Sequence, residues 1–278
     1  MNPLKIAILD MYNNFPNQGM RCIHQLIEQQ KAQTPTPLIC DVFNVRAELE
    51  IPSLDYDIYI SSGGPGSPLP SDEAWEAPYF DFIDRLFEWN RTNVQKKRVL
   101  LICHSFQLVS RHLGVGTISK RKSTSFGIFP IHETAAGRKD PIFQGLNDPF
   151  MAVDSRDYQV TKPDAARIKD LGVKVLALEK ARPHVPLERA IMALRFTDDI
   201  VGTQFHPEAD SVGMLHYMLT TERREQVIET YGEKKYNTMV RLLKDPEAIE
   251  RTNTVVVPTF LRRAIEDITS QTEHAVTF

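Results

Sequence analysis

The sequence predicts an α/β fold with three layers, in which a mostly parallel central sheet carries helices on both faces, and a helical C-terminal extension follows. Short apolar runs rich in β-branched residues recur through the first 208 of the 278 residues, and segments with helical spacing separate the early runs. Strands that alternate with helices form parallel sheets through right-handed crossovers. The hydrophobic share of 42% and the charged share of 25% are typical of a folded globular chain.

Short apolar runs bounded by loop residues predict the strands. They cover residues 5–9, 38–45, 57–61, 98–103, 126–131, 150–154, 173–179, 191–196 and 200–205. The later runs follow one another closely in the sequence. We therefore expect an antiparallel part added to the parallel sheet.

Three helices are predicted between the early strands. The first carries Ile23 and Ile27 at helical spacing, after a loop rich in Asn, Pro and Gly. The second covers residues 72–91, where Ser71 and two acidic residues favour a helix start. The third begins directly after Cys103, because apolar residues then recur on one helical face.

The character of the sequence changes after Glu208, where strand-like runs become few and Glu, Arg, Lys and Leu are abundant. We expect helices at 211–219, at 222–243 as one or two segments, and at 258–270 with Pro258 in the first turn. The chain therefore divides into a domain at 1–208 and a helical extension at 209–278. The extension either packs on the domain's own surface or docks a partner subunit or a second copy of the chain.

Charge and cysteine content narrow the functional classes. The net charge of −3 gives no electrostatic reason to expect a nucleic-acid or membrane partner, and the basic clusters at 96–97 and 120–122 are solvated loops or a docking patch. No apolar run is long enough to span a bilayer, and the N-terminal apolar stretch is too short for a signal peptide. Three cysteines without ligand spacing predict neither a disulfide framework nor a metal site. We expect a cytoplasmic protein without cofactor.

One cysteine stands where a nucleophile would be placed. Residues 99–107 form an apolar strand that runs into Cys103 and then into a helix. A side chain on such a turn is exposed at the carboxyl end of the sheet, and the helix N-terminus favours a thiolate and can hold an oxyanion. The alternative is a small buried side chain. Ser105 would lie inside the helix, which argues against a serine nucleophile.

Two further segments bear on this alternative. The turn at 61–68, Ser-Ser-Gly-Gly-Pro-Gly-Ser-Pro, follows a predicted strand and can expose backbone N–H donors. An ordinary Gly/Pro turn without a binding role is the alternative. His206 and Glu208 follow the last predicted strand in a Phe-His-Pro-Glu sequence. Because they stand two residues apart in an extended chain, both side chains point to the same side, so the carboxylate can orient the imidazole.

These three motifs, in this order, resemble the class I glutamine amidotransferases, and the turn is most similar to that of the glutaminase domain of GMP synthase. The motifs are Gly-Gly-Pro-Gly-Ser-Pro at 63–68, Ile-Cys-x-x-x-Gln at 102–107 and Phe-His-Pro-Glu at 205–208. The resemblance implies a flavodoxin-like fold and a catalytic triad. In that triad Cys103 is the nucleophile, His206 the general base and acid, and Glu208 the residue that orients the imidazole.

The resemblance also implies where the substrate binds. The turn at Gly63 and Gly64 would supply the N–H of Gly64 to an oxyanion hole, together with the N–H of His104. Gln107 would lie near the bound glutamine. Glutamine is then the expected small-molecule substrate, and no metal takes part.

Three residues depart from the family pattern. Leu101 and Ser105 occupy the positions of the two glycines in the usual Gly-x-Cys-x-Gly elbow. Arg156 stands where the family has a histidine in a Ser-His pair. Since arginine is always protonated, it cannot act as a base, and it either binds the carboxylate of a substrate or forms a salt bridge with Asp154 or Asp157.

The expected activity is hydrolysis of the glutamine side-chain amide through a cysteinyl thioester, with ammonia released to an unidentified acceptor or a partner synthetase. No ATP-binding loop or synthetase-like segment follows residue 208. An acyltransferase or γ-glutamyl hydrolase with the same triad is the alternative within enzymes. A binding or regulatory protein that kept the fold is the alternative outside them.

Overall fold

The computed structural model describes residues 3–184 and 186–276, which are built around a nine-stranded sheet. The strands are β1 (Leu4–Asp10), β2 (Leu38–Asn44), β3 (Ile58–Ser61), β4 (Arg98–Ile102), β5 (Thr117–Glu133), β6 (Phe150–Thr161), β7 (Lys174–Glu179), β8 (Ile191–Arg195) and β9 (Ile200–Thr203). Their order across the sheet is β2-β1-β3-β4-β9-β8-β7-β5-β6.

The two halves of the sheet differ in strand direction. From β2 to β9 all neighbours pair in parallel, whereas β9, β8, β7, β5 and β6 pair antiparallel. The predicted fold class is therefore confirmed, together with the antiparallel addition. The carboxyl ends of β4 and β9 lie next to each other at the centre of the sheet, which is where ligands bind in open α/β sheets.

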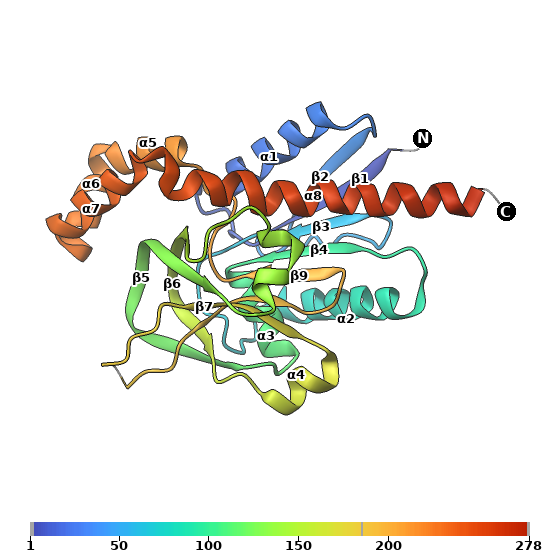
Figure 1. Cartoon of the computed structure of the whole chain (residues 1–278), viewed down its shortest axis with the longest axis horizontal. Coiled ribbons are helices and arrows are strands. Elements are labelled where there is room, and N and C mark those ends of the chain that lie inside the picture. The colour runs from blue at the N-terminus through green and yellow to red at the C-terminus, as the bar shows by residue number, and fades with distance from the viewer. Residues whose placement is uncertain (1–2, 185, 277–278) are drawn as a thin grey trace.

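Helices cover both faces of the sheet (Figure 1). On β1, Ile6 and Ile8 pack in one apolar cluster with α1 (Gly19–Gln33) and α8 (Pro246–Val276). The alternate residues Ala7 and Leu9 pack in a second cluster on the other face. The helices of that cluster are α2 (Glu76–Thr92), α3 (His104–His112) and α4 (Ala165–Leu171).

Helix α8 is longer than the sequence predicts. We expected a helix that begins at Pro258, but Pro258 lies inside α8, which begins at Pro246. Buried apolar residues precede and follow the proline, among them Val256, Val257 and Leu261, and they pack in the same cluster as β1. Tertiary packing thus holds a helix through a residue that usually ends one.

Helices α5 (Ser211–Leu219), α6 (Thr221–Tyr231) and α7 (Glu233–Leu243) form a small group at one end of α8 (Figure 1). Gly232, with φ of 84°, separates α6 from α7, so the predicted 222–243 segment is two helices. These helices share an apolar cluster with Ile128 on β5 and Val153 on β6. The extension therefore contributes to the packing of the sheet. The predicted boundary at 208/209 stays a prediction.

Two other sequence expectations are corrected. Helix α2 begins at Glu76 rather than at 72, and Ser71 does not cap it but donates a 2.6 Å hydrogen bond to the Glu76 carboxylate. Helix α4 was not predicted, because it has only seven residues and none of them is fully buried. None of the described helices is long and apolar enough to cross a membrane.

The packing of α8 predicts a stability effect at Leu261, whose side chain is fully buried. Replacement by alanine removes buried methyl groups and leaves a cavity, so Leu261→Ala should lower the free energy of unfolding by about 2–5 kcal/mol. Urea unfolding followed by circular dichroism measures this change. Arg262→Ala, at an exposed neighbour on the same helix, is the control and should change stability by less than about 0.5 kcal/mol. Equal, small effects would show that α8 contributes little to the core.

Candidate active site

Cys103 lies at the sharp junction between β4 and α3. Its φ of 46° and ψ of −95° lie in a region that residues other than glycine rarely adopt. The backbone is held there from both sides. Its N–H donates to the carbonyl oxygen of Thr203 on β9 at 2.7 Å, and its carbonyl oxygen accepts the N–H of Gln107 at 3.0 Å.

The two residues that replace the usual elbow glycines are accommodated by their neighbours. Gly202 on β9 leaves room for Leu101, because a Cβ at Gly202 would lie 3.3 Å from that of Leu101 and 2.9 Å from the Phe106 ring. Ser105 is fully buried, and its hydroxyl donates to the carbonyl oxygen of Ser62 at 2.7 Å. The serine therefore links the first turn of α3 to the segment before the glycine turn.

His206 and Glu208 lie on the loop that follows β9. The Nδ1 of His206 is 2.8 Å from Oε1 of Glu208. Two backbone contacts fix this loop: the N–H of His206 donates to the carbonyl oxygen of Val153 at 2.8 Å, and the Asn253 side chain on α8 donates to the carbonyl oxygen of Glu208 at 2.7 Å. The predicted same-side arrangement of the two side chains is therefore present.

The pKa of His206 lies well above the ordinary histidine range. Burial acts to lower this pKa, but the charges of Glu208 and Cys103, and hydrogen bonds to both, raise it and prevail. The imidazole thus bridges the carboxylate and the sulfur. Both neighbours favour its protonated form.

Glu208 lies against the N-terminal turn of α1. Its carboxylate is almost fully buried, and a Cβ at Gly19, the first residue of α1, would lie 3.2 Å from Oε1. The positive end of the helix dipole stabilises a negative charge at this place. Tyr12 packs at the same turn, and burial, followed by the charge of Glu208, raises the pKa of its phenol well above the usual value.

The sulfur of Cys103 has two polar neighbours in addition to His206. The carbonyl oxygen of Ser155 on β6 lies 3.8 Å from Sγ and can accept from the thiol. The side-chain amide of Gln204 donates to the sulfur over 3.6 Å. Strand β6 and the segment after β9 therefore meet at Cys103.

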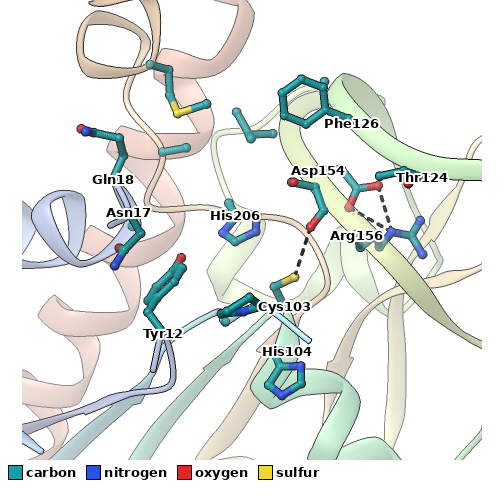
Figure 2. A pocket seen from close by; sticks show the side chains of 18 of the residues that line it. Tyr12, Asn17, Gln18, Cys103, His104, Thr124, Phe126, Asp154, Arg156 and His206 are labelled. Carbon is teal, nitrogen blue, oxygen red and sulfur yellow. Dashed lines mark hydrogen bonds and ion pairs between the residues drawn. The ribbon is translucent and has the colours of Figure 1, made fainter. Parts of the chain in front are cut away.

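A cavity of about 460 Å³ opens at Cys103 and His206 (Figure 2). Tyr12, Asn17 and Gln18 lie on one side of it, and strands β5 and β6 form the other side (Figure 2). Side chains of α5, α6 and α7 complete the wall: Met214, Tyr217, Arg223, Tyr231, Met239 and Leu243. The helical extension thus contributes to the surroundings of the candidate site.

The glycine turn passes directly beside Cys103 and His206. A Cβ at Gly63 would lie 2.8 Å from Cε1 of His206 and 3.6 Å from Cβ of Cys103. Gly64 lines the cavity, and a Cβ there would overlap the carbonyl oxygen of Met11. Only glycine fits at either position without displacing a neighbour. The role of the Gly64 N–H in an oxyanion hole stays a prediction.

His104 and Gln107 also line the cavity, but their side chains have structural contacts. The His104 ring points away from the cavity (Figure 2), and burial beside two arginines lowers its pKa to about 3. The Gln107 amide donates to the carbonyl oxygen of Tyr158 at 2.9 Å and to Oε1 of Gln204 at 3.0 Å. Contact between Gln107 and a bound glutamine stays a prediction.

Arg156 forms the salt bridge that was one of its two expected roles. Its Nε lies 2.9 Å from both carboxylate oxygens of Asp154, and its side chain is 1% exposed. Nη2 lies 3.7 Å from the carboxylate of Glu179. The guanidinium is therefore paired with protein carboxylates, and Nη1 is a buried group without a hydrogen-bond partner among the described residues.

The other two cysteines have raised pKa values, although Cys22 also lines the cavity. Burial raises the pKa of Cys22 to about 12 and that of Cys40 to about 11. Both thiols stay protonated at neutral pH, as expected of packing residues. Among the side chains that the structure describes, no group of three or more His, Cys, Asp and Glu residues could hold a metal ion.

The comparisons with known proteins identify the family. The model of the glutamine amidotransferase class-I family matches residues 21–223. The chain belongs to this family. Solved structures of similar fold include a glutamine amidotransferase from Thermotoga maritima, with a TM-score of 0.68 and 13% identity over 96% of this chain and all of that one. Another, from Methylobacillus flagellatus, has a TM-score of 0.60 and 14% identity over 94% and 93% of the two chains.

Curated relatives of this amidotransferase-family chain carry a different name. A homoserine O-acetyltransferase from Phocaeicola vulgatus is 31% identical over 118 residues, which are 42% of this chain and 36% of the relative. One from Bacteroides fragilis is 35% identical over 107 residues, 38% of this chain and 33% of the relative. The matched stretch thus spans about a third of the length of these curated relatives.

Three residues at the site escaped the sequence analysis: Tyr12, Gln204 and Asn253. Tyr12 and Asn253 come from segments far from any of the three motifs, and nothing in their local sequence marks them. Gln204 could have been noticed, since it stands in the predicted strand at 200–205, two residues before His206.

The electrostatics of the His-Glu pair predict the effect of neutralising Glu208. Glu208→Gln removes the charge that raises the pKa of His206, so the imidazole should lose its proton at a lower pH than in the wild type. Nitrogen-15 NMR of the histidine side chains measures this titration midpoint. Glu225→Gln, at an exposed carboxylate on α6, is the matched control and should leave it unchanged. An unchanged midpoint in Glu208→Gln would contradict the assigned cause.

The close approach at Gly63 predicts a local block of the site. In Gly63→Ala the imidazole of His206 must move away, and alkylation of Cys103 by iodoacetamide at neutral pH should slow by about tenfold or more, while the fold is kept because the nearest atoms are side-chain ends. At Gly114, nothing lies within 4 Å of a Cβ but φ is 66°. Gly114→Ala should therefore lower the melting temperature and leave alkylation unchanged. The reverse pattern would contradict this interpretation.

Proposed function

We propose that the chain is a glutaminase of the class I amidotransferase type, which hydrolyses the side-chain amide of glutamine through a thioester on Cys103. The observation that carries the proposal is the strained cysteine at the β4–α3 junction, within hydrogen-bonding reach of an imidazole that Glu208 holds at 2.8 Å. A cysteine held at this conformational cost, beside an oriented base, is typical of a nucleophile.

In the first half of the reaction, the Cys103 thiolate attacks the side-chain amide carbon of glutamine. The carbonyl electron pair moves to oxygen, and the N–H groups of Gly64 and His104 stabilise the oxyanion. As this intermediate collapses, the carbon–nitrogen bond breaks and His206 transfers its proton to the departing nitrogen. Ammonia and a γ-glutamyl thioester are formed.

In the second half, a water molecule attacks the thioester carbon. His206, now neutral, takes the proton of the water, and a second oxyanion forms at the same donors. Its collapse breaks the carbon–sulfur bond, releases glutamate and restores the Cys103 thiolate beside the protonated imidazole. Glu208 keeps the imidazole in one orientation throughout and stabilises its charged form.

A second candidate function is acyl transfer, which the names of the curated relatives favour. The same thioester chemistry could take an acyl group from a thioester donor and pass it to the hydroxyl of an amino acid. The two functions share Cys103, His206 and Glu208 and differ in the acyl donor and in the final acceptor. Hydrolysis of a γ-glutamyl amide or peptide is a variant of the first.

The fate of the ammonia and the partner are also part of the proposal. We propose that an acceptor enzyme docks as a separate subunit and receives the ammonia. The helical extension, which carries the exposed Val212 and Leu219, is the surface we propose for this contact or for a second copy of the chain. The proposed compartment is the cytoplasm.

The decisive variant is Cys103→Ala. Purified full chain should release glutamate from glutamine, or transfer an acetyl group from an acetyl thioester to homoserine, and Cys103→Ala should lower the rate by about 10⁴-fold or more because no thioester can form. Cys40→Ala, a substitution at a thiol outside the cavity, is the control and should keep the wild-type rate. Activity that persists in Cys103→Ala would contradict both functions.

The covalent intermediate distinguishes the two functions even when turnover is slow. Wild-type chain is incubated with glutamine or with acetyl thioester, quenched in acid and digested, and the mass of the Cys103 peptide is measured. A γ-glutamyl adduct supports the glutaminase, and an acetyl adduct supports the acyltransferase. If neither adduct forms and a chloromethyl ketone analogue of glutamine leaves Cys103 unlabelled, the proposal of a covalent enzyme is wrong and a binding role is favoured.

A further inference from the structure

We infer that Gln204 is a positioning residue for the nucleophile, which holds the Cys103 sulfur as a thiolate through a hydrogen-bond relay that begins at Tyr158. The inference rests on the proposed role of Cys103 and extends it to a residue outside the triad. Gln204 is completely buried, and its backbone N–H donates to the carbonyl oxygen of Met192 on β8 at 2.8 Å. Its side chain is therefore held in one place beside the sulfur.

The direction of the relay is fixed at its far end. The carbonyl oxygen of Tyr158 can only accept, so the amide group of Gln107 must turn its Nε2 toward it, at 2.9 Å. The second hydrogen on the same nitrogen points to Oε1 of Gln204 at 3.0 Å. Because Oε1 of Gln204 accepts from Gln107, the Nε2 of Gln204 faces the sulfur of Cys103, at 3.6 Å. A reversed Gln204 would bring two N–H groups together.

The relay favours one protonation state of the sulfur. A thiol donates its hydrogen, and the carbonyl oxygen of Ser155 at 3.8 Å can receive it. A thiolate has no hydrogen to donate and gains from every N–H that faces it, so the Gln204 amide acts most strongly after His206 has taken the proton. The Ser155 carbonyl therefore favours the thiol of Cys103, whereas Gln204 favours the thiolate, which is the reactive form.

Charged groups around the sulfur come from several elements. His206 and Tyr12 are electrostatically coupled to Cys103, and Glu208 is coupled to both of them. On α3, His104 is held neutral by burial, and on β6, Asp154 and Arg156 are paired with each other. Gln204 is uncharged. Its replacement by methionine, which has a similar length, therefore removes a hydrogen bond and leaves these charges in place.

The test is the pH dependence of Cys103 alkylation in the full chain, measured with iodoacetamide and peptide mass spectrometry. In Gln204→Met the pH midpoint should rise by about one unit, and the rate at neutral pH should fall about tenfold. Gln107→Met should shift the midpoint in the same direction, and the double variant should shift it no further than Gln204→Met alone, because both act through one relay. Gln159→Met is the matched control. Gln159 lies on β6 and its side chain accepts a hydrogen bond from Arg121, so this substitution should leave the midpoint unchanged.

The outcomes separate this inference from the proposed function. If wild-type Cys103 reacts no faster than Cys22 and Cys40, the proposed nucleophile itself is wrong. If Cys103 is reactive but its midpoint is the same in Gln204→Met, the relay is overturned and the nucleophile stands. Circular dichroism checks each fold, and should Gln204→Met fail to fold, an unshifted midpoint in Gln107→Met overturns the relay equally.

Discussion

The backbone of Cys103 is held in a conformation that its side chain disfavours, and the arrangement of the site depends on this constraint. A residue in such a region costs of order 1–3 kcal/mol and persists only where its surroundings over-determine it. Here the surroundings are the bond to Thr203 on the neighbouring strand and the first turn of α3. Because β4 and β9 are adjacent and parallel, the chain that leaves β9 carries His206 past the same point. One pair of strands thus delivers both the thiol and the imidazole.

The helical extension contacts the candidate site directly. Helix α8 packs along the sheet through a long apolar face, and near its start Asn253 holds the carbonyl oxygen of Glu208 while the hydroxyl of Thr252 donates to the carbonyl oxygen of Met151 at 2.6 Å. These bonds join the loop that carries the His-Glu pair to β6. Helices α5 to α7, between that loop and α8, line the cavity. The extension is therefore coupled to the site by both packing and hydrogen bonds.

The sequence predicts those parts of the site that depend on neighbouring residues in the chain. A strand that runs into Cys103 is a local pattern, and β4 has this geometry. His206 and Glu208 also meet as predicted, but through a turn at 207–208 and not through extended backbone. Gln204, two residues before His206, could have been noticed. Tyr12 and Asn253 come from distant segments and depend on the tertiary arrangement, so they left no mark in a single sequence. The same reason explains the error at Pro258. Local propensity predicts a helix start there, but buried apolar neighbours on both sides hold the helix through it.

Strand β6 positions Cys103 and His206 through its backbone carbonyl groups. It is an edge strand, so one row of its backbone groups has no partner strand, and residues two apart direct their carbonyl groups to the same side. The carbonyl oxygen of Val153 accepts the N–H of His206, and that of Ser155 lies 3.8 Å from the sulfur of Cys103. Between them, Asp154 is tied to Arg156 by two contacts of 2.9 Å and to Ser125 on β5 at 2.7 Å. The buried ion pair therefore stiffens the segment against which the loop of His206 rests, so a substitution of Arg156 would act on this loop through β6.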